Sequence, residues 1–258
     1  MKNIAIVTGA SGGLGKEIVK LIIGEVDELW AIGRNVSKID AFKAELGEQG
    51  AKIVPLQMDL SDTKSYDTLS AKLKKESDAH IRWLVNNAGA GRFGHSKDFS
   101  LSEISASVTS HCTAIAAICN ICIPYMKKGD IIMNVSSQSA FLPLPYINLY
   151  ASTKAFVYSY TRALKTELKN SGIKVTAVCP GWIKTNLIVD TLNGVKVKYP
   201  FIDEAAHVAK KAVRDARKGK AISINSLPIA FMTWLQLHMP QKITIGIWLS
   251  LVKNYVEK

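Results

Sequence analysis

The stretch that decides the fold is KNIAIVTGASGGLGKEIVKLI, residues 2–22. Its first part, residues 3–8, is an apolar run of strand length that is rich in Ile and Val. A glycine-rich turn follows at residues 9–15, and apolar residues then recur at helical spacing. A strand, a glycine turn and a helix in this order indicate phosphate binding, because glycines let the backbone approach a pyrophosphate and the first amides of the helix face its charge. We expect this site to include Gly9, Ser11, Gly13, Leu14 and Gly15.

The same alternation of strand and helix patterns continues along the 258 residues. Strand-like runs recur at 4–7, 28–32, 52–57, 82–86, 130–135, 173–178 and 221–224. Amphipathic or capped stretches lie between them, at 13–24, 36–47, 62–77, 102–127, 149–171 and 203–218, with Asp203-Glu204 as a helix start. This pattern predicts a doubly wound parallel sheet in a three-layer α/β/α, Rossmann-like fold. We expect one domain, with a dinucleotide-binding catalytic part at 1–222 and an apolar C-terminal helical extension at 223–258 packed on it.

A candidate acid/base pair lies in the run YASTK, residues 150–154. The spacing of four places Tyr150 and Lys154 one turn apart on the same helix face. A free phenol has a pKa near about 10, and a neighbouring cation lowers it. A phenol tuned in this way donates a proton to a carbonyl oxygen or takes one from an alcohol. Ser137 lies thirteen residues before Tyr150.

Several ordered motifs extend this pair. The glycine turn reads T-G-x-x-x-G-x-G from Thr8, rather than the G-x-G-x-x-G of most dinucleotide sites. NNAG follows at 86–89, and P-G-x-x-x-T follows at 180–185. With Ser137, Tyr150 and Lys154, these motifs make residues 3–185 resemble the classical short-chain dehydrogenase/reductase family.

The resemblance implies roles for these residues in a nicotinamide-dependent reaction. Tyr150 is implied as the acid in reduction, Lys154 as the group that lowers its pKa and holds the nicotinamide ribose, and Ser137 as the group that orients the substrate oxygen. The cofactor residues it implies beyond the glycine turn are Asp59, Leu60, Asn87, Ala88, Gly89, Tyr150, Lys154, Pro180, Gly181, Ile183 and Thr185.

The end of the second strand bears on which cofactor binds. An acidic residue there binds the ribose hydroxyls of NAD and repels a 2′-phosphate. This chain has Gly33 at that position, and Arg34 follows. A guanidinium next to an emptied acidic position suits a phosphate by charge and by bidentate geometry. We expect NADP(H) to be preferred over NAD(H).

One position departs from the family pattern. The family usually has an Asn thirteen residues before a Pro, where it helps hold a water that connects the lysine to solvent; counting back from Pro124 gives His111. A neutral His111 would position that water and, with a pKa near about 6.5, add a pH dependence on the acid side. Two alternatives stay open: Ser110 takes the role after a shift of one residue, or the relay is weakened.

The segments after Ser137 and after Gly181 are mostly apolar and predict the substrate class. An apolar pocket with few polar groups suits a hydrophobic ketone or secondary alcohol, which within the family indicates a hydroxysteroid-like substrate. The alternatives are a 3-oxoacyl (fatty-acyl) reductase and, from another class, a non-catalytic dinucleotide-binding sensor. The substrate residues that we expect are Ser139, Phe141, Leu144, Trp182 and Leu187.

Composition and charge limit the other functions. The net charge is +12, and much of it is clustered at residues 210–220. Aromatic residues are not interleaved with these cations, so we expect a solvated helix face and no nucleic-acid partner. Cys119 and Cys122 lie in an apolar helical stretch, so we expect core packing rather than a metal or redox site. The first strand begins at once, which leaves no signal peptide, and we expect a cytoplasmic, thiol-reduced protein.

The C-terminal extension is an addition to the family pattern. Residues 221–241 contain no Asp, Glu, Lys or Arg, and the prolines and polar residues among them argue against a membrane-spanning helix. We expect amphipathic helices buried in the protein or its oligomer, or else covering the substrate mouth or lying on a membrane surface. By the resemblance, a homodimer or homotetramer forms through 102–127 and 149–171. The residues of the extension that we expect to be buried are Phe231, Trp234, Leu235, Trp248 and Leu249.

Overall fold

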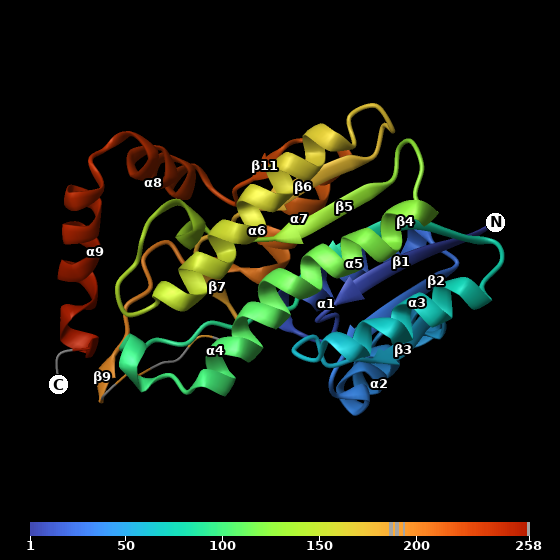
Figure 1. The fold of residues 1–258 in the computed structure, drawn as a ribbon, viewed down its shortest axis with the longest axis horizontal. Helices are drawn as coiled ribbons and strands as arrows, with labels where there is room; N and C mark the ends of the chain where they lie inside the picture. Colours follow the sequence, from blue (N-terminus) through green and yellow to red (C-terminus); the bar gives the residue numbers. More distant parts are fainter. Residues whose placement is uncertain (186–187, 189–190, 193, 257–258) are drawn as a thin grey trace.

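The computed structural model describes residues 1–185, 188, 191–192 and 194–256. Its main sheet has seven parallel strands in the order β11-β6-β5-β4-β1-β2-β3 (Figure 1). The order reverses beside β1, which is the doubly wound topology that the sequence predicts. The strands are β1 (Lys2–Thr8), β2 (Glu28–Gly33), β3 (Ile53–Gln57), β4 (Ala79–Asn86), β5 (Ile131–Val135), β6 (Lys174–Val178) and β11 (Ile222–Ser223).

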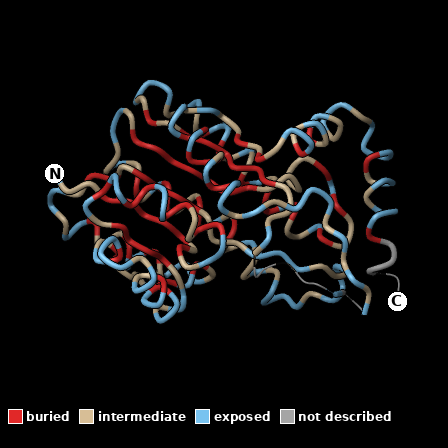
Figure 2. Tube along the Cα trace, turned by 180° about the vertical axis from the view of Figure 1, so that it is seen from behind, coloured by how far each residue is buried: buried red, intermediate tan, exposed pale blue. Residues whose placement is uncertain are grey.

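Helices cover both faces of this sheet, because successive strand side chains point to opposite sides. On β1, Ala5 and Val7 join one buried cluster, and Ile4 and Ile6 join the other. In the tube of Figure 2 the buried residues concentrate along the strands, as expected for a parallel sheet covered on both faces. The first cluster includes α1 (Gly13–Ile22), α2 (Val36–Glu45) and α7 (Ala205–Arg217), and the second includes α3 (Tyr66–Lys75), α5 (Ala114–Cys122) and α6 (Asn148–Glu167).

Most predicted helices end two to four residues later than the observed ones, and three predicted helices differ in a way that has a local cause. The helix predicted from residue 62 begins at Tyr66, after a 3-10 turn that Asp62 caps. The helix predicted from Asp203 begins at Ala205, because Asp203 and Glu204 form β10, which pairs with β7 (Ile183–Lys184). The long helix predicted at 102–127 is α4 (Leu101–Val108) followed by α5, with one turn of π-helix at Thr109–Thr113 between them.

The helical run Leu101–Tyr125 is long and apolar enough, by length and composition alone, to cross a membrane. A core helix of a soluble protein passes the same test, and the α5 part of this run packs on the sheet. Cys119 and Cys122 are buried there with free thiols, as expected for core packing. The buried side chains of α5 are Ala114, Ile115, Ile118, Cys119 and Cys122.

The C-terminal extension forms α8 (Leu227–His238) and α9 (Gln241–Val256), at the end of the molecule toward which the main strands point (Figure 1). Burial of this extension is only partial. Phe231 and Trp234 are exposed, contrary to the prediction, and Leu249 is exposed as well. Leu235 and Trp248 are half-buried. A short hairpin of β8 (Thr191–Leu192) and β9 (Val195–Lys196) precedes α7.

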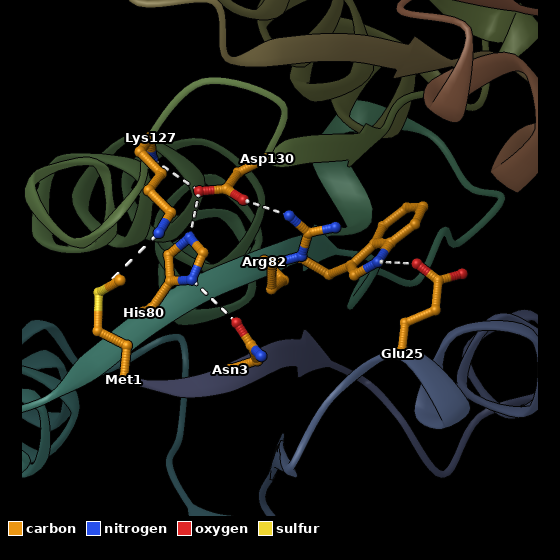
Figure 3. Close-up of polar contacts among 8 residues, drawn as sticks. Met1, Asn3, Glu25, His80, Arg82, Lys127 and Asp130 are labelled. Atoms are coloured by element: carbon orange, nitrogen blue, oxygen red, sulfur yellow. Dashed lines mark hydrogen bonds and ion pairs between the residues drawn. The ribbon is translucent and has the colours of Figure 1, made fainter.

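A buried polar cluster closes the opposite end of the sheet, where the strands begin (Figure 3). His80 lies between Asn3 Oδ1, at 2.9 Å from Nδ1, and Asp130 Oδ2, at 2.8 Å from Nε2. Asp130 is fully buried and also accepts the amide hydrogen of Lys127 at 2.6 Å. Arg82 lies 3.4 Å from its other oxygen. These contacts tie β1, β4 and β5 together at the end far from the glycine turn.

Candidate functional site

The glycine turn connects the carboxyl end of β1 to α1. Gly9 has a φ of +66°, a left-handed conformation that glycine adopts without strain. A Cβ atom on Gly15 would lie 2.2 Å from the carbonyl oxygen of Gly9, so the turn requires glycine there too. Gly12 is the N-cap of α1, and neither a capping side chain nor an acidic residue occupies the first turn of this helix. The first amides of α1 therefore remain available to an anion.

The glycine turn is fixed to the loop after β4 by two side chains. The hydroxyl of Thr8 accepts the amide hydrogens of Asn87 and Ala88, each at 3.0 Å. The Asn87 side chain donates to the carbonyl oxygens of Thr8 and Gly9, each at 3.2 Å. The predicted cofactor residues of these two loops thus form one rigid edge of the sheet.

The segment after β6 closes the other side of the glycine turn. A Cβ atom on Gly13 would lie 2.6 Å from the methyl group of Thr185, so Thr185 packs directly over the turn. Gly181 donates its amide hydrogen to Asn225 at 3.1 Å. Ile183 lies in β7 and contacts the core. The structure therefore brings together at one edge the four cofactor residues that are predicted in this segment, which are Pro180, Gly181, Ile183 and Thr185.

Arg34 and Asp59 stand at the ends of the neighbouring strands β2 and β3. Arg34 is exposed, and its positive charge contributes to a lowered pKa of the Asp59 carboxyl, whose main causes are hydrogen bonds from the Ser61 amide and hydroxyl. Asn35 caps α2 by accepting the amide hydrogen of Lys38 at 3.1 Å, so the Arg34 side chain is not used as a cap. Leu60, the next residue after Asp59, is buried.

The predicted catalytic residues converge from β5 and α6. The Ser137 hydroxyl accepts the amide hydrogen of Ser139 at 3.1 Å and also hydrogen-bonds to Tyr150. Burial raises the pKa of the Tyr150 phenol, whereas the hydrogen bond from Ser137 lowers it. The direction is opposite to the lowered pKa that the sequence predicts for this phenol, because burial has a larger effect than the hydrogen bond from Ser137. The phenol is held in its protonated, proton-donating form.

Lys154 lies buried beside this phenol. Its ammonium donates to the carbonyl oxygen of Val135 at 2.8 Å and lies 5.6 Å from the centre of the Tyr150 ring. Burial lowers the pKa of Lys154 to about 8. A Cβ atom on Gly89 would lie 3.0 Å from Lys154 Nζ, so a side chain at this position would crowd the ammonium. The ammonium is thus placed between the phenol and the loop after β4.

His111 also contacts that loop, because the π-helical turn at Thr109–Thr113 directs it inward. Its Nε2 accepts the amide hydrogen of Ala90 at 3.1 Å, and its Nδ1 lies 3.3 Å from the Thr153 hydroxyl. Burial, with the nearby charge of Lys154, lowers the pKa of His111 to about 3. The predicted pH dependence near 6.5 is therefore wrong. Ser110 donates to the carbonyl oxygen of Ala106 within its own helix at 2.7 Å, which argues against a shift of one residue.

An apolar cluster surrounds Tyr150 and combines distant parts of the chain. Leu144, one of the expected substrate residues, belongs to it. Ile245 and Trp248 of α9 pack on the same cluster, and Trp248 donates its indole hydrogen to the carbonyl oxygen of Pro145 at 3.0 Å. The members of this cluster, which we name the site cluster, are Phe93, Leu142, Leu144, Ile147, Tyr150, Ala151, Ile245 and Trp248.

Phe93 is a site residue that the sequence analysis missed. Its ring lies 6.4 Å from the rings of both Trp182 and Trp248 and is stacked with each. Tyr199 packs edge-on against Trp182 at 4.9 Å. Phe93 follows the NNAG motif by four residues, and an aromatic residue so close to that motif is the only sequence signal that points to it.

The remaining predicted substrate residues differ in their placement. Phe141 contacts Tyr158 edge-on at 4.7 Å and is not part of the site cluster. Ser139 has a buried hydroxyl with no hydrogen-bond partner among the described residues, which leaves it available to a ligand. Leu187 lies outside the residues that the structure describes.

Comparisons with known proteins add to this geometry. The family model for short chain dehydrogenase matches residues 3–194. An uncharacterized oxidoreductase of Staphylococcus epidermidis is 26% identical over 232 residues, which cover 88% of this chain and 96% of the relative. The solved structure of a short-chain dehydrogenase from Sphingobium yanoikuyae in complex with NADPH is 25% identical, with a TM-score of 0.76 and coverage of 98% of this chain and 96% of that one. A short chain dehydrogenase/reductase from Burkholderia phymatum in complex with NAD has a TM-score of 0.78 at 18% identity, with coverage of 91% and 92%.

Proposed function

The chain belongs to the short chain dehydrogenase family, and on this premise we propose that it transfers a hydride between NADP(H) and a hydrophobic ketone or secondary alcohol of hydroxysteroid-like shape. The family match by itself supports an oxidoreductase that uses a nicotinamide dinucleotide. The single observation that supports a hydrophobic substrate is the site cluster, in which the Tyr150 phenol lies among mostly apolar side chains.

The residues present fit a nicotinamide dinucleotide. The glycine turn leaves the first amides of α1 without a side-chain cap, which suits a pyrophosphate. In our proposal this turn, with Asn87, Gly89 and Thr185, holds the cofactor. The exposed Arg34, next to Gly33, supports a preference for the 2′-phosphate of NADP(H). The NADPH complex of the Sphingobium relative agrees with this preference, and the Burkholderia structure carries NAD.

The bound cofactor would supply the hydride, and the protein supplies the proton and the orientation. We assign Ser137 to hold the substrate oxygen and the Tyr150 phenol to protonate it during reduction. The raised pKa of Tyr150 keeps this proton in place until transfer. The buried ammonium of Lys154 stabilises the phenolate that forms as the proton leaves. His111 acts indirectly, because it fixes the Ala90 amide and the start of the loop over Tyr150.

The substrate class follows from the walls of the site. The aliphatic and aromatic side chains of the site cluster come from the segment between β5 and α6, from α6 itself, from the loop after β4 and from α9. Such a wall suits a bulky, apolar ring system better than a small polar alcohol. The unpartnered hydroxyl of Ser139 is available as a second polar contact.

The surfaces of α4 and α6 support a homodimer or homotetramer. No residue of α4 is buried within the described chain, although Leu101 and Val108 are apolar. Phe156 of α6 is exposed as well, and it stacks with Tyr160 at 6.0 Å between ring centres. A second copy would cover these side chains. The four free thiols agree with a cytoplasmic location.

The test is turnover with NADPH or NADH on a panel that contains steroid ketones and 3-oxoacyl thioesters. We expect loss of NADPH absorbance with the steroid ketones, and a loss of about 10²–10⁴-fold in rate for Tyr150→Phe with unchanged NADPH binding. Tyr125→Phe, in the 3-10 turn Ile123–Tyr125 that follows α5, is the control. Turnover of the 3-oxoacyl thioesters alone would show that the substrate is a fatty-acyl carbonyl instead of a steroid ketone. Cofactor binding without any turnover would indicate a non-catalytic sensor.

A further inference from the structure

The outer face of α8 is an exposed apolar stripe. Leu227, Phe231, Trp234 and Leu237 recur at intervals of four, three and three residues, which places them on one side of the helix. Their exposed fractions are 86%, 61%, 53% and 58%. The rings of Phe231 and Trp234 are stacked at 6.2 Å. We name these four residues the α8 stripe.

The next helix repeats the feature. On α9, Ile243, Ile247 and Leu251 recur every four residues and are all about half exposed. Its other side packs on the site cluster through Ile245 and Trp248. Figure 2 shows exposed residues along much of the outside of both helices. Contiguous exposed apolar surface of this kind marks an interaction site rather than ordinary surface.

A cationic cavity adjoins the α8 stripe. It has a volume of about 420 Å³ and lies between α7, β11 and the first turn of α8. Lys211, Arg214 and Lys220 line it, and Asp215, which pairs with Lys211 and Lys220, is the one carboxylate among the described lining residues, so the net charge of the lining is +2. Leu227, the first residue of the α8 stripe, and Ala230 also line this cavity. The positively charged cavity and the apolar α8 stripe therefore meet at Leu227.

We propose that the end of the molecule formed by α8 and α9 binds the surface of a bilayer that contains anionic lipids, with the cavity near Arg214 receiving a lipid phosphate. An aromatic and aliphatic helix face beside cations is the arrangement that inserts at the headgroup boundary. Trp234 suits this depth, because its ring is apolar and its indole hydrogen is polar.

The charge of the chain favours a lipid surface over a second copy. A second copy packed symmetrically on this face would bring its own cationic cavity against this one. Anionic lipids supply the opposite charge. The contact needs no change in the site, because the α8 stripe contains none of the residues that we assign to catalysis or cofactor binding.

The test is co-sedimentation of the full chain with vesicles of phosphatidylcholine, alone or mixed with phosphatidylglycerol. We expect binding to the mixed vesicles, weaker binding to phosphatidylcholine alone, and loss of more than about tenfold in affinity for Phe231→Ser/Trp234→Ser. Arg214→Gln should lower affinity for the mixed vesicles by about fivefold. Leu227→Ser should also weaken binding, whereas Leu101→Ser, which changes a residue that is equally 86% exposed on α4, should not. Lys74→Gln on α3 is the charge control.

Unchanged Tm values would show that these variants remain folded. Equal binding of Phe231→Ser/Trp234→Ser and the unaltered chain would overturn the proposal, as would equal binding to both kinds of vesicle. Absence of vesicle binding, with Phe231→Ser/Trp234→Ser dissociating an oligomer in size-exclusion chromatography, would assign this face to a second copy instead.

Discussion

His111 accepts the amide hydrogen of Ala90 on its Nε2 atom, at 3.1 Å. The Thr153 hydroxyl donates its own hydrogen to the carbonyl oxygen of Tyr150 at 2.8 Å, so it accepts from His111 Nδ1. The two contacts together require the neutral ring with hydrogen on Nδ1. A protonated ring would lose the Ala90 hydrogen bond and would face the Lys154 ammonium. His111 therefore links the loop after β4 to α6 as a fixed, neutral group.

This burial makes His111 a source of acid sensitivity in stability. Its pKa is about 3 in the folded chain and about 6.5 when unfolded, so the unfolded chain binds more protons between these values. Stability therefore falls as pH decreases below about 6.5, by about 2 kcal/mol between pH 7 and pH 5. His111→Asn should remove this part of the loss. Urea unfolding of both proteins at the two pH values measures it, and an equal loss in both would contradict the neutral assignment.

Lys154 should determine the alkaline limb of the reduction rate. Its pKa is lowered to about 8, so it loses its proton as pH rises through that value, while the raised pKa of Tyr150 keeps the phenol protonated. We expect kcat/KM for ketone reduction to fall above pH 8, without an acid limb near pH 6.5 in either the unaltered chain or His111→Asn. Lys154→Arg, which stays charged, should shift the alkaline limb to higher pH. If the alkaline limb of kcat/KM stays at the same pH in Lys154→Arg, the titration of another group causes it.

The order of strands and helices and the edge that carries the site could be predicted from the sequence, because they depend on local patterns. The alternation of apolar runs fixes which segments are strands, and the spacing of Tyr150 and Lys154 places them on one helix face. The glycine turn is predictable for the same reason, since the glycines at positions 9, 13 and 15 follow a strand-like run and open a helix-like one.

The remaining features depend on contacts between distant segments. Phe93 and Trp248 meet although more than half of the chain separates them, and no periodicity connects them. The pKa values of Tyr150 and His111 follow burial, which a motif does not contain. Asp203 and Glu204 mark the start of α7, with Glu204 as its N-cap, but their pairing with β7 joins two segments that no local pattern connects.

Arg34 should determine cofactor preference. Arg34→Gln removes the positive charge beside Gly33 and keeps a polar side chain, so we expect the Kd of NADPH to rise by about tenfold or more and that of NADH to change by less than about twofold. Fluorescence titration of each cofactor measures both. Lys74→Gln is the control for loss of a distant surface charge. Equal weakening of the two cofactors would contradict a role for Arg34 in reading the 2′-phosphate.

Asp130 should be required for stability but not for chemistry. It is fully buried, contacts His80, Arg82 and the amide of Lys127, and lies at the end of the sheet far from Tyr150 (Figure 3). Asp130→Asn should lower the free energy of unfolding by about 1–3 kcal/mol, because the buried His80 ring and the Lys127 amide lose hydrogen bonds to a carboxylate. Asp78→Asn, which changes an exposed partner of the N-terminus at 3.9 Å, should cost less than about 1 kcal/mol. Denaturant titration compares them, and a loss of NADPH binding in folded Asp130→Asn would contradict a purely structural role.

Trp248 provides the most direct test of the apolar site, because α9 brings it there from the C-terminal extension. Its ring stacks with Phe93, and its indole donates a hydrogen bond to the carbonyl oxygen of Pro145, so it is held in the same cluster as Leu144. Trp248→Ala removes this ring and should raise KM for a steroid ketone by about tenfold or more, with little change in kcat or in the KM for a small ketone, because uniform binding is lost rather than transition-state contacts. Trp234→Ala, which changes an exposed tryptophan of the same extension, is the matched control and should leave both KM values unchanged. A fall in kcat with unchanged KM in Trp248→Ala would mean that α9 supports the catalytic residues instead of lining the substrate pocket.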